Sequence, residues 1–279
     1  MKKNIKCSIV VTSHNQADTI IQTLNSILAQ TCNFDYEIII GDDFSHDGTR
    51  TICIDYKNKY PEKIKLIFQD KNVGVVNNFI NCVQKAESEY IAICAADDYW
   101  HNPNKLQLQV DFLEKNPDYG LIYTDYDRYN TNTGKLTQNW LKKTKKTIYE
   151  GTNLTKFFFE GKVPALTVTV MFRKYLFDKY IPVEDFIKYE FPIEDWPTWL
   201  ILSNYTKIAF LPDSTSTYRY GHTSLSNPQE YEVIEKKFEK EKEMYKYLCN
   251  MFNDIYIFNE QMYENYIKTI LPRIRIKEC

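Results

Sequence analysis

The sequence predicts an α/β fold in which a mostly parallel sheet is flanked by helices, with a helical extension at the C-terminal end. Two observations lead to this prediction. Short apolar runs alternate with helical patterns through the first half of the 279-residue chain, as in parallel sheets whose strands are joined by right-handed crossovers. From Pro228 onwards the pattern is helical, first charged and then aromatic. We therefore expect one α/β domain over residues 1–225 and a helical extension over residues 226–279.

The individual elements follow from the apolar pattern in chain order. Uncharged, β-branched runs such as CSIVV predict buried strands, and apolar residues spaced three and four apart predict helices with one buried face. The expected strands are residues 7–11, 37–41, 63–69, 90–95, 121–126, 165–173 and 207–211. The expected helices are residues 17–29, 49–59, 75–86, 104–114 and 194–203, and the lysine-rich segment 130–160 is expected to leave this pattern.

Charge and composition narrow the classes of function. The net charge of -2 argues against a nucleic-acid binder, which usually carries a strong basic excess. No stretch is long and apolar enough to span a bilayer. The seven cysteines form no C-x-x-C pair, so a reducing cytoplasm is the simplest setting. The tail residues Arg273, Arg275 and Lys277 could make peripheral contact with the anionic inner face of the membrane, although a solvated tail is the more common case.

Polar side chains gather at or near the ends of four expected strands. Ligands bind outside the carboxyl ends of the strands in open parallel sheets. One such cluster is usually a turn or a helix cap, but four at the same edge favour a ligand site. The clusters are Thr12-Ser13-His14-Asn15, Asp42-Asp43, Asn72-Val73-Gly74 and Asp97-Asp98.

Asp97 and Asp98 follow a fully apolar strand. Two adjacent carboxylates repel each other unless a positive group compensates, and Mg²⁺ or Mn²⁺ does so while also bridging phosphate oxygens. We interpret this pair as a divalent-metal site. The alternative is a solvated helix N-terminus near Asn102 and Pro103, where acidic side chains interact well with the helix dipole.

A second pair of carboxylates, Glu194 and Asp195, stands beside Trp196 and Trp199. Aromatic neighbours partly desolvate a carboxylate, which suits it to act as a general base. The two tryptophans could also stack on the face of a sugar acceptor. The alternative is that the acidic residues only cap the helix that follows.

Two other positions suggest ligand contacts. Asp43 could accept a hydrogen bond from a nucleobase or a ribose, although the turn at Asp47-Gly48 explains part of its cluster. His222 is expected in a loop with Arg219, where both could complete a phosphate or metal site. A lone histidine is more often structural.

The motifs together resemble a known family. The segments are CSIVVTSHNQADTIIQTLNSILAQT, EIIIGDDFSHDGT, NVGVVNNF, YIAICAADDYW with PNKLQLQVDFL, IEDWPTWL and YRYGHTSLS. In this order and spacing they resemble the inverting glycosyltransferases of family two, over roughly residues 5–225. The resemblance implies a GT-A fold with a Rossmann-like sheet, a nucleotide-sugar donor, a divalent metal and a hydroxyl acceptor on a glycan or lipid-linked chain.

The resemblance also implies donor contacts, carried over position by position. Thr12, His14 and Asn15 match the segment that touches the nucleotide. Asp43 matches the aspartate that reads the base, commonly uracil. Gly74 and Asn78, in the segment NVGVVNNF after the third expected strand, lie at or near positions that contact the donor.

The remaining roles lie later in the chain. Asp97 and Asp98 match the region that holds the ribose and the metal, and Asp195 matches the catalytic base, with Glu194 beside it. Arg219 and His222 fall in the late loop over the donor phosphates.

Two positions depart from the family pattern, and two rival functions stay open. Ala95 stands where the family usually has an acid, and His222 lies one residue after the usual late histidine. These differences put the ribose contact and the metal-ligand role of His222 in question. A sugar-1-phosphate nucleotidyltransferase would need a glycine-rich basic loop, which TSHNQAD lacks. A non-catalytic nucleotide- or glycan-binding subunit would not need Asp195.

Overall fold

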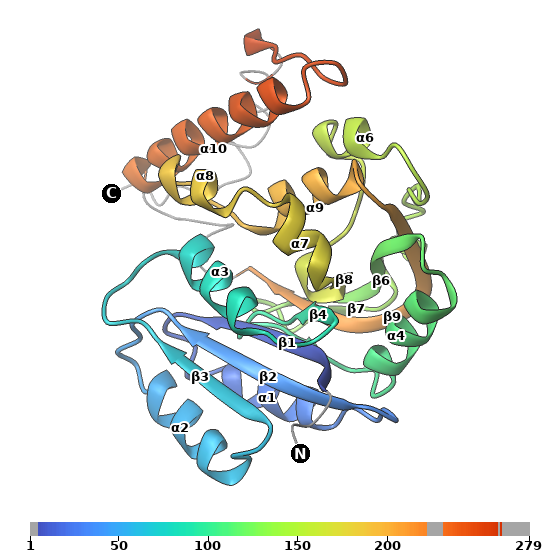
Figure 1. The fold of residues 1–279 in the computed structure, drawn as a ribbon. Coiled ribbons are helices and arrows are strands. Elements are labelled where there is room, and N and C mark those ends of the chain that lie inside the picture. The colour runs from blue at the N-terminus through green and yellow to red at the C-terminus, as the bar shows by residue number, and fades with distance from the viewer. Residues whose placement is uncertain (1–4, 222–230, 262, 264–279) are drawn as a thin grey trace.

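The computed structural model describes residues 5–221, 231–261 and 263. Within these residues nine strands form one sheet in the order β3-β2-β1-β4-β8-β6-β9-β5, and β7 pairs with β6 (Figure 1). The strands are β1 (Ile5–Ser13), β2 (Asp35–Asp42), β3 (Ile64–Phe68), β4 (Tyr90–Ile93), β5 (Tyr99–Trp100), β6 (Tyr119–Asn130), β7 (Leu136–Thr137), β8 (Met171–Arg173) and β9 (Lys207–Tyr220). The predicted α/β class is confirmed.

The first four strands are parallel, with β1 between β2 and β4 and with β3 outside β2. Their carboxyl ends therefore lie at one edge of the sheet. Helices connect the strands and cover both faces. They are α1 (Ile20–Leu28), α2 (Thr49–Lys59), α3 (Val75–Lys85), α4 (Lys105–Lys115), α5 (Trp140–Lys143), α6 (Thr155–Phe159), α7 (Lys174–Tyr180), α8 (Val183–Lys188), α9 (Asp195–Ser203) and α10 (Tyr231–Met251), with a 3-10 turn, η1 (Thr167–Thr169).

The central strands are buried on both faces because successive side chains point to opposite sides of the sheet. In β1, Ile9 packs into the cluster formed with α1 and α2, whereas Val10 packs into the cluster formed with α3. Ile38 and Ile39 of β2 divide in the same way. Figure 1 shows α3 on the opposite side of the sheet from α1 and α2. Continuous apolar runs without alternation are the sequence signature of such strands.

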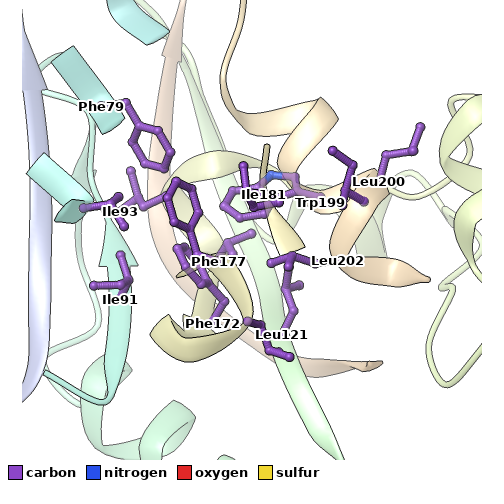
Figure 2. Close-up of a cluster of buried hydrophobic side chains, with 14 of the residues drawn as sticks. Phe79, Ile91, Ile93, Leu121, Phe172, Phe177, Ile181, Trp199, Leu200 and Leu202 are labelled. Atoms are coloured by element: carbon purple, nitrogen blue, oxygen red, sulfur yellow. The ribbon is translucent and has the colours of Figure 1, made fainter. Parts of the chain in front are cut away.

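The segment 165–173 differs from its prediction as one strand. Only Met171–Arg173 forms a strand, and Thr167–Thr169 forms the 3-10 turn η1. The short strand β8 runs antiparallel to both of its neighbours, β4 and β6. Figure 2 shows Phe172 of β8 among Phe177 and Trp199, in the core between the sheet and α7 and α9. The burial of these aromatic side chains holds β8 in position, and a longer run of hydrogen bonds to the neighbouring strands is not needed.

The strands β6 and β9 extend well past the predicted segments 121–126 and 207–211. They pair in parallel from Tyr119 to Asn130, with irregular register near Asp125. As a result Arg219 belongs to β9 and not to a loop. This extension carries the end of β9 across to the edge where β4 ends.

The helix α10 confirms the predicted helical character over Tyr231–Met251, whereas residues 252–259, expected to be helical as well, are not. Its apolar side chains Met244, Leu248 and Cys249, with Phe252 just beyond, are buried in the same core cluster as α9. Figure 1 shows α10 lying over α8 and α9. The division into residues 1–225 and 226–279 stays a prediction, and the tail arginines lie outside the described residues. No helix within the described part of the chain has the length and apolar character needed to cross a membrane.

A fully buried lysine, Lys105 of α4, predicts a pH dependence of stability. Burial lowers the pKa of Lys105 to about 7, and the thiols of Cys94 and Cys7 face it. In the unfolded chain a lysine keeps its ordinary pKa of 10.5. Between pH 7 and pH 10.5 the unfolded state therefore binds more protons, and the free energy of unfolding rises with pH.

We expect Lys105→Met to remove this pH-dependent contribution to the free energy of unfolding. The stability of the variant relative to the wild type should fall by about 2 kcal/mol between pH 7 and pH 9. Urea unfolding at several pH values measures this difference, with the exposed Lys115→Met at the end of the same helix as the matched control. Parallel pH profiles for the wild type and Lys105→Met would contradict a neutral buried lysine.

Candidate active site

A cavity of about 530 Å³ opens at the carboxyl edge of the parallel strands. Residues at or after the ends of β1, β2, β3 and β4 line it together with the η1 region, the start of α9 and the end of β9. Most residues predicted for the site lie on its wall. These are Thr12, His14, Asn15, Asp43, Gly74, Asn78, Asp97, Asp98, Glu194, Asp195 and Arg219. The structure thus brings together clusters that are far apart in the sequence.

The two aspartates after β2 have different surroundings. Asp42 is fully buried and forms an ion pair with Arg50, with 2.6 Å between Oδ1 and Nε. Asp43 lines the cavity, and its carboxylate accepts backbone N–H groups of Val73 at 2.7 Å and Gly74 at 2.9 Å. Each Asp43 oxygen can accept a second hydrogen bond. Asp42 therefore anchors the strand end, while Asp43 fixes the loop before α3 and faces the cavity.

The loops after β1 and β2 are tied to each other. His14 Nδ1 lies 2.6 Å from the carbonyl oxygen of Asp43, so this nitrogen carries the proton and donates it. The backbone N–H of Asn15 donates to Ser45 Oγ at 2.8 Å, and the backbone N–H of His46 donates to Asn15 Oδ1 at 2.8 Å. Asn15 has a positive φ of 53°, a conformation that asparagine tolerates better than most residues. Both loops are thereby held at the cavity edge.

Asn78 reaches the cavity from α3 because the helix approaches β2 closely at Gly41. The Asn78 side chain donates to the Gly41 carbonyl at 2.8 Å. A Cβ atom at Gly41 would lie 2.6 Å from Asn78 Oδ1 and 2.3 Å from Cys82 Sγ. Only glycine permits this approach, and Asn78 is almost fully buried as a result.

Asp97 and Asp98 meet Arg219 at the base of the cavity. The Arg219 backbone N–H donates to Asp98 Oδ1 at 2.8 Å. Its guanidinium donates to the Asp97 carbonyl and to the Gln22 side chain, and lies over the ring of Tyr99 at 4.7 Å. Burial, and next the charge of Asp97, raise the pKa of Asp98 well above its usual range. Arg219 is thus one positive group that compensates this acidic pair.

The donor set at Asp97 and Asp98 fits a divalent cation that is shared with a phosphate ligand. The described residues contain no group of three or more His, Cys, Asp or Glu side chains placed to hold a metal by themselves. Mg²⁺ commonly binds through one or two carboxylates and completes its coordination with substrate phosphates and water. Two carboxylates at a cavity wall match this pattern. His222, the third predicted ligand, lies outside the described residues.

Glu194 and Asp195 also line the cavity, at the start of α9, as predicted. One oxygen of the Asp195 carboxylate accepts a hydrogen bond from the Thr167 hydroxyl. The other accepts a hydrogen bond from the backbone N–H of Trp196 at 2.6 Å. Glu194 is the N-cap residue, but its side chain forms no capping hydrogen bond. Burial and the charge of Asp195 raise the pKa of Glu194.

The predicted aromatic acceptor contacts are only partly compatible with the structure. Trp199 is 1% exposed and packs against Phe172 in the core, so it cannot stack on a ligand. Its prediction as an acceptor contact is wrong because, one turn into α9, its side chain already packs in the core, whereas the residues at the start of the helix are only partly buried. Trp196 instead stacks on Tyr245 and lines a second cavity of about 640 Å³ beneath α10. Ile193 lines both cavities.

Several cavity residues were not predicted from the sequence. Thr167 is the first residue of η1 and Leu166 directly precedes it. Tyr218 precedes Arg219 in β9. Thr167 was hidden by the apolar alternation of ALTVTVMFR, which is typical of a strand. The TYRY alternation could have indicated that Tyr218 and Arg219 belong to a strand entering the site.

The comparison with known protein families defines the class. Residues 8–181 match the family described as Glycosyl transferase family 2, which covers more than half of the chain. The chain belongs to this family. Its sequence is 40% identical over 111 residues to an uncharacterised protein of Mycobacterium tuberculosis, covering 40% of this chain and 32% of that protein. The match therefore spans about a third of that relative's length.

More particular relatives carry named activities. The chain is 29% identical over 126 residues to the UDP-Glc:alpha-D-GlcNAc-diphosphoundecaprenol beta-1,3-glucosyltransferase WfgD of Escherichia coli, covering 45% of this chain and 47% of that protein. The fold of this chain resembles that of S. aureus TarS in complex with UDP-GlcNAc, with a TM-score of 0.64 and 18% identity. The match covers 96% of this chain and 72% of the TarS chain. It also resembles the mannosyltransferase PcManGT of Pyrobaculum calidifontis in complex with GDP-Man and Mn²⁺, with a TM-score of 0.57, 15% identity, and coverage of 78% and 57%. The predicted GT-A fold is confirmed.

Proposed function

We propose that this chain transfers a sugar from a nucleotide diphosphate sugar to an acceptor hydroxyl, with inversion at the anomeric carbon. The observation that carries the proposal is that acidic groups of two kinds line one cavity. Asp43 and Asp98 follow strands of the parallel sheet, and Asp195 begins α9 at the same cavity. A single general base at Asp195, with the nucleoside diphosphate as leaving group, favours a single in-line displacement, which inverts the reacting centre.

In this proposal Asp195 removes the proton from the acceptor hydroxyl as it attacks. Its carboxylate is oriented by two hydrogen bonds. Burial and the charge of Asp195 raise the pKa of its neighbour Glu194, which makes Glu194 less suited to act as a charged base.

We further propose that Asp97 and Asp98 hold Mg²⁺ or Mn²⁺ together with the donor diphosphate. When bound, the cation neutralises charge that develops on the leaving nucleoside diphosphate. Arg219 lies against both aspartates and would add a second positive charge beside the phosphates. The Mn²⁺ in the Pyrobaculum calidifontis complex supports the use of such a metal.

For the acceptor we propose a glycan or lipid-linked sugar. The support is the E. coli relative, whose name specifies a diphosphoundecaprenol-linked acceptor. Trp196 is the aromatic side chain retained for acceptor contact, because it follows Asp195 directly and is only partly buried. A turnover assay with candidate lipid-linked acceptors separates this function from that of a non-catalytic binding subunit.

We expect UDP to bind about tenfold or more tightly than CDP or GDP. Asp43 is an acceptor-only carboxylate at the cavity wall, and uracil offers an N3–H donor that cytosine lacks. The UDP-glucose and UDP-GlcNAc named for the E. coli and S. aureus proteins favour the same base. Calorimetric titration of the three diphosphates in the presence of Mn²⁺ measures the preference. Equal or tighter binding of CDP would remove Asp43 from the role of base reader, whereas tighter binding of GDP, whose guanine also carries a ring N–H donor, would overturn the preference for uracil.

A further inference from the structure

The 3-10 turn η1 stands between the core and the cavity. Thr167, its first residue, lines the cavity and donates its hydroxyl to Asp195 Oδ2. The next two residues, Val168 and Thr169, are fully buried. The turn therefore carries one partly buried hydroxyl that faces the cavity, on an otherwise buried support.

The support is built from four side-chain donors that bind two consecutive carbonyl oxygens. Trp100 Nε1 and Ser216 Oγ donate to the Val168 carbonyl at 3.1 and 3.0 Å. Lys105 Nζ and Gln109 Nε2 of α4 donate to the Thr169 carbonyl at 3.1 and 2.9 Å. Within the turn, Thr169 N–H donates to the Leu166 carbonyl at 2.8 Å.

A buried lysine is costly to a folded protein, and its placement here has a structural effect. Lys105 and Gln109 are both fully buried and hydrogen-bonded to each other at 2.5 Å. They satisfy a carbonyl that the short strand β8 leaves outside the sheet ladder. Because β5, β9 and α4 all contribute donors, the position of η1 is fixed from three directions.

We infer that Thr167 is a positioning residue for Asp195, held in place by this buried support. Its hydroxyl binds one carboxylate oxygen while the Trp196 N–H binds the other. These two contacts fix the rotation of the carboxylate and leave its remaining lone pairs for an acceptor hydroxyl. The inference rests on the proposed role of Asp195 as the general base.

The test compares Thr167→Val, which removes the hydroxyl, with Thr167→Ser, which keeps it. With a UDP-sugar and its acceptor, Thr167→Val should lower kcat about tenfold, with little change in the KM for the donor. Thr167→Ser should recover most of the rate. Thermal unfolding of each variant without ligand checks that the fold is retained.

A double-mutant cycle with Asp195→Asn separates this role from a general structural one. If Thr167 acts through Asp195, adding Thr167→Val to Asp195→Asn should slow the reaction no further. A full additional tenfold loss in the Asp195→Asn background would overturn the inference, as would an unchanged kcat in Thr167→Val alone. If Asp195→Asn itself keeps full activity, the proposed role of Asp195 as the general base fails instead.

Discussion

Asp195→Asn is expected to slow sugar transfer by about 10²–10⁴-fold, because an amide cannot take the proton of the acceptor hydroxyl. Donor affinity should barely change, since the donor is proposed to bind on the wall that carries Asp43 and Asp98. Initial rates with a UDP-sugar measure the loss, and calorimetry with UDP measures donor affinity. Hydrolysis of the donor by water offers a second signal.

The surface residue Asp178, paired with Lys174 on α7, offers a matched control in Asp178→Asn. If Asp195 only stabilises the start of α9, asparagine is almost as good a residue there and transfer continues near the wild-type rate. Full activity of Asp195→Asn would move the base elsewhere, and Glu194→Gln would then be the variant to measure.

Asp98→Ala is expected to abolish the Mn²⁺-dependent part of the stabilisation by UDP. A ligand present at 100 times its Kd stabilises the folded state by about 2.7 kcal/mol, so the loss is large in a thermal-shift experiment. The reason is that Asp98 is one of two carboxylates at the cavity that fit a shared metal and diphosphate. The measurement compares the melting temperature with UDP, with and without Mn²⁺.

Two controls make the Asp98 result specific. Asp98 accepts the Arg219 N–H, so Asp98→Ala should also cost about 1–3 kcal/mol of stability without ligand. Asp98→Asn keeps an acceptor oxygen and tests how much of the change comes from that bond alone. The exposed Asp118→Ala should leave the metal effect intact. Undiminished Mn²⁺-dependent binding in Asp98→Ala would exclude it from the metal site.

Strand ends are the most predictable part of the site. Parallel strands without internal charge bring their carboxyl ends together, so the polar residues after them meet regardless of loop details. This physical rule is enough to predict that His14, Asp43 and Asp98 share one cavity. It does not separate Asp42 from Asp43, because the register that buries Asp42 against Arg50 depends on tertiary contacts.

The second half of the sheet is less predictable. The antiparallel strand β8 is too short to produce a clear period, and the aromatic packing around Phe172 sets its position. The pattern around Thr167 therefore predicts a strand, although this residue belongs to a turn that faces the cavity. Trp199 is the reverse case. Its place beside the predicted catalytic carboxylates suggests a ligand contact, but its side chain belongs to the core.

The linked loops after β1 and β2 have a consequence for the thermodynamics of donor binding. Asn15 joins the two loops through its backbone and side chain, and Asp43 fixes the loop before α3. This wall is therefore preorganised, and a nucleotide need not immobilise these loops when it binds. Preorganisation lowers the entropic cost of association, so most of the intrinsic contact energy with the base can appear as affinity.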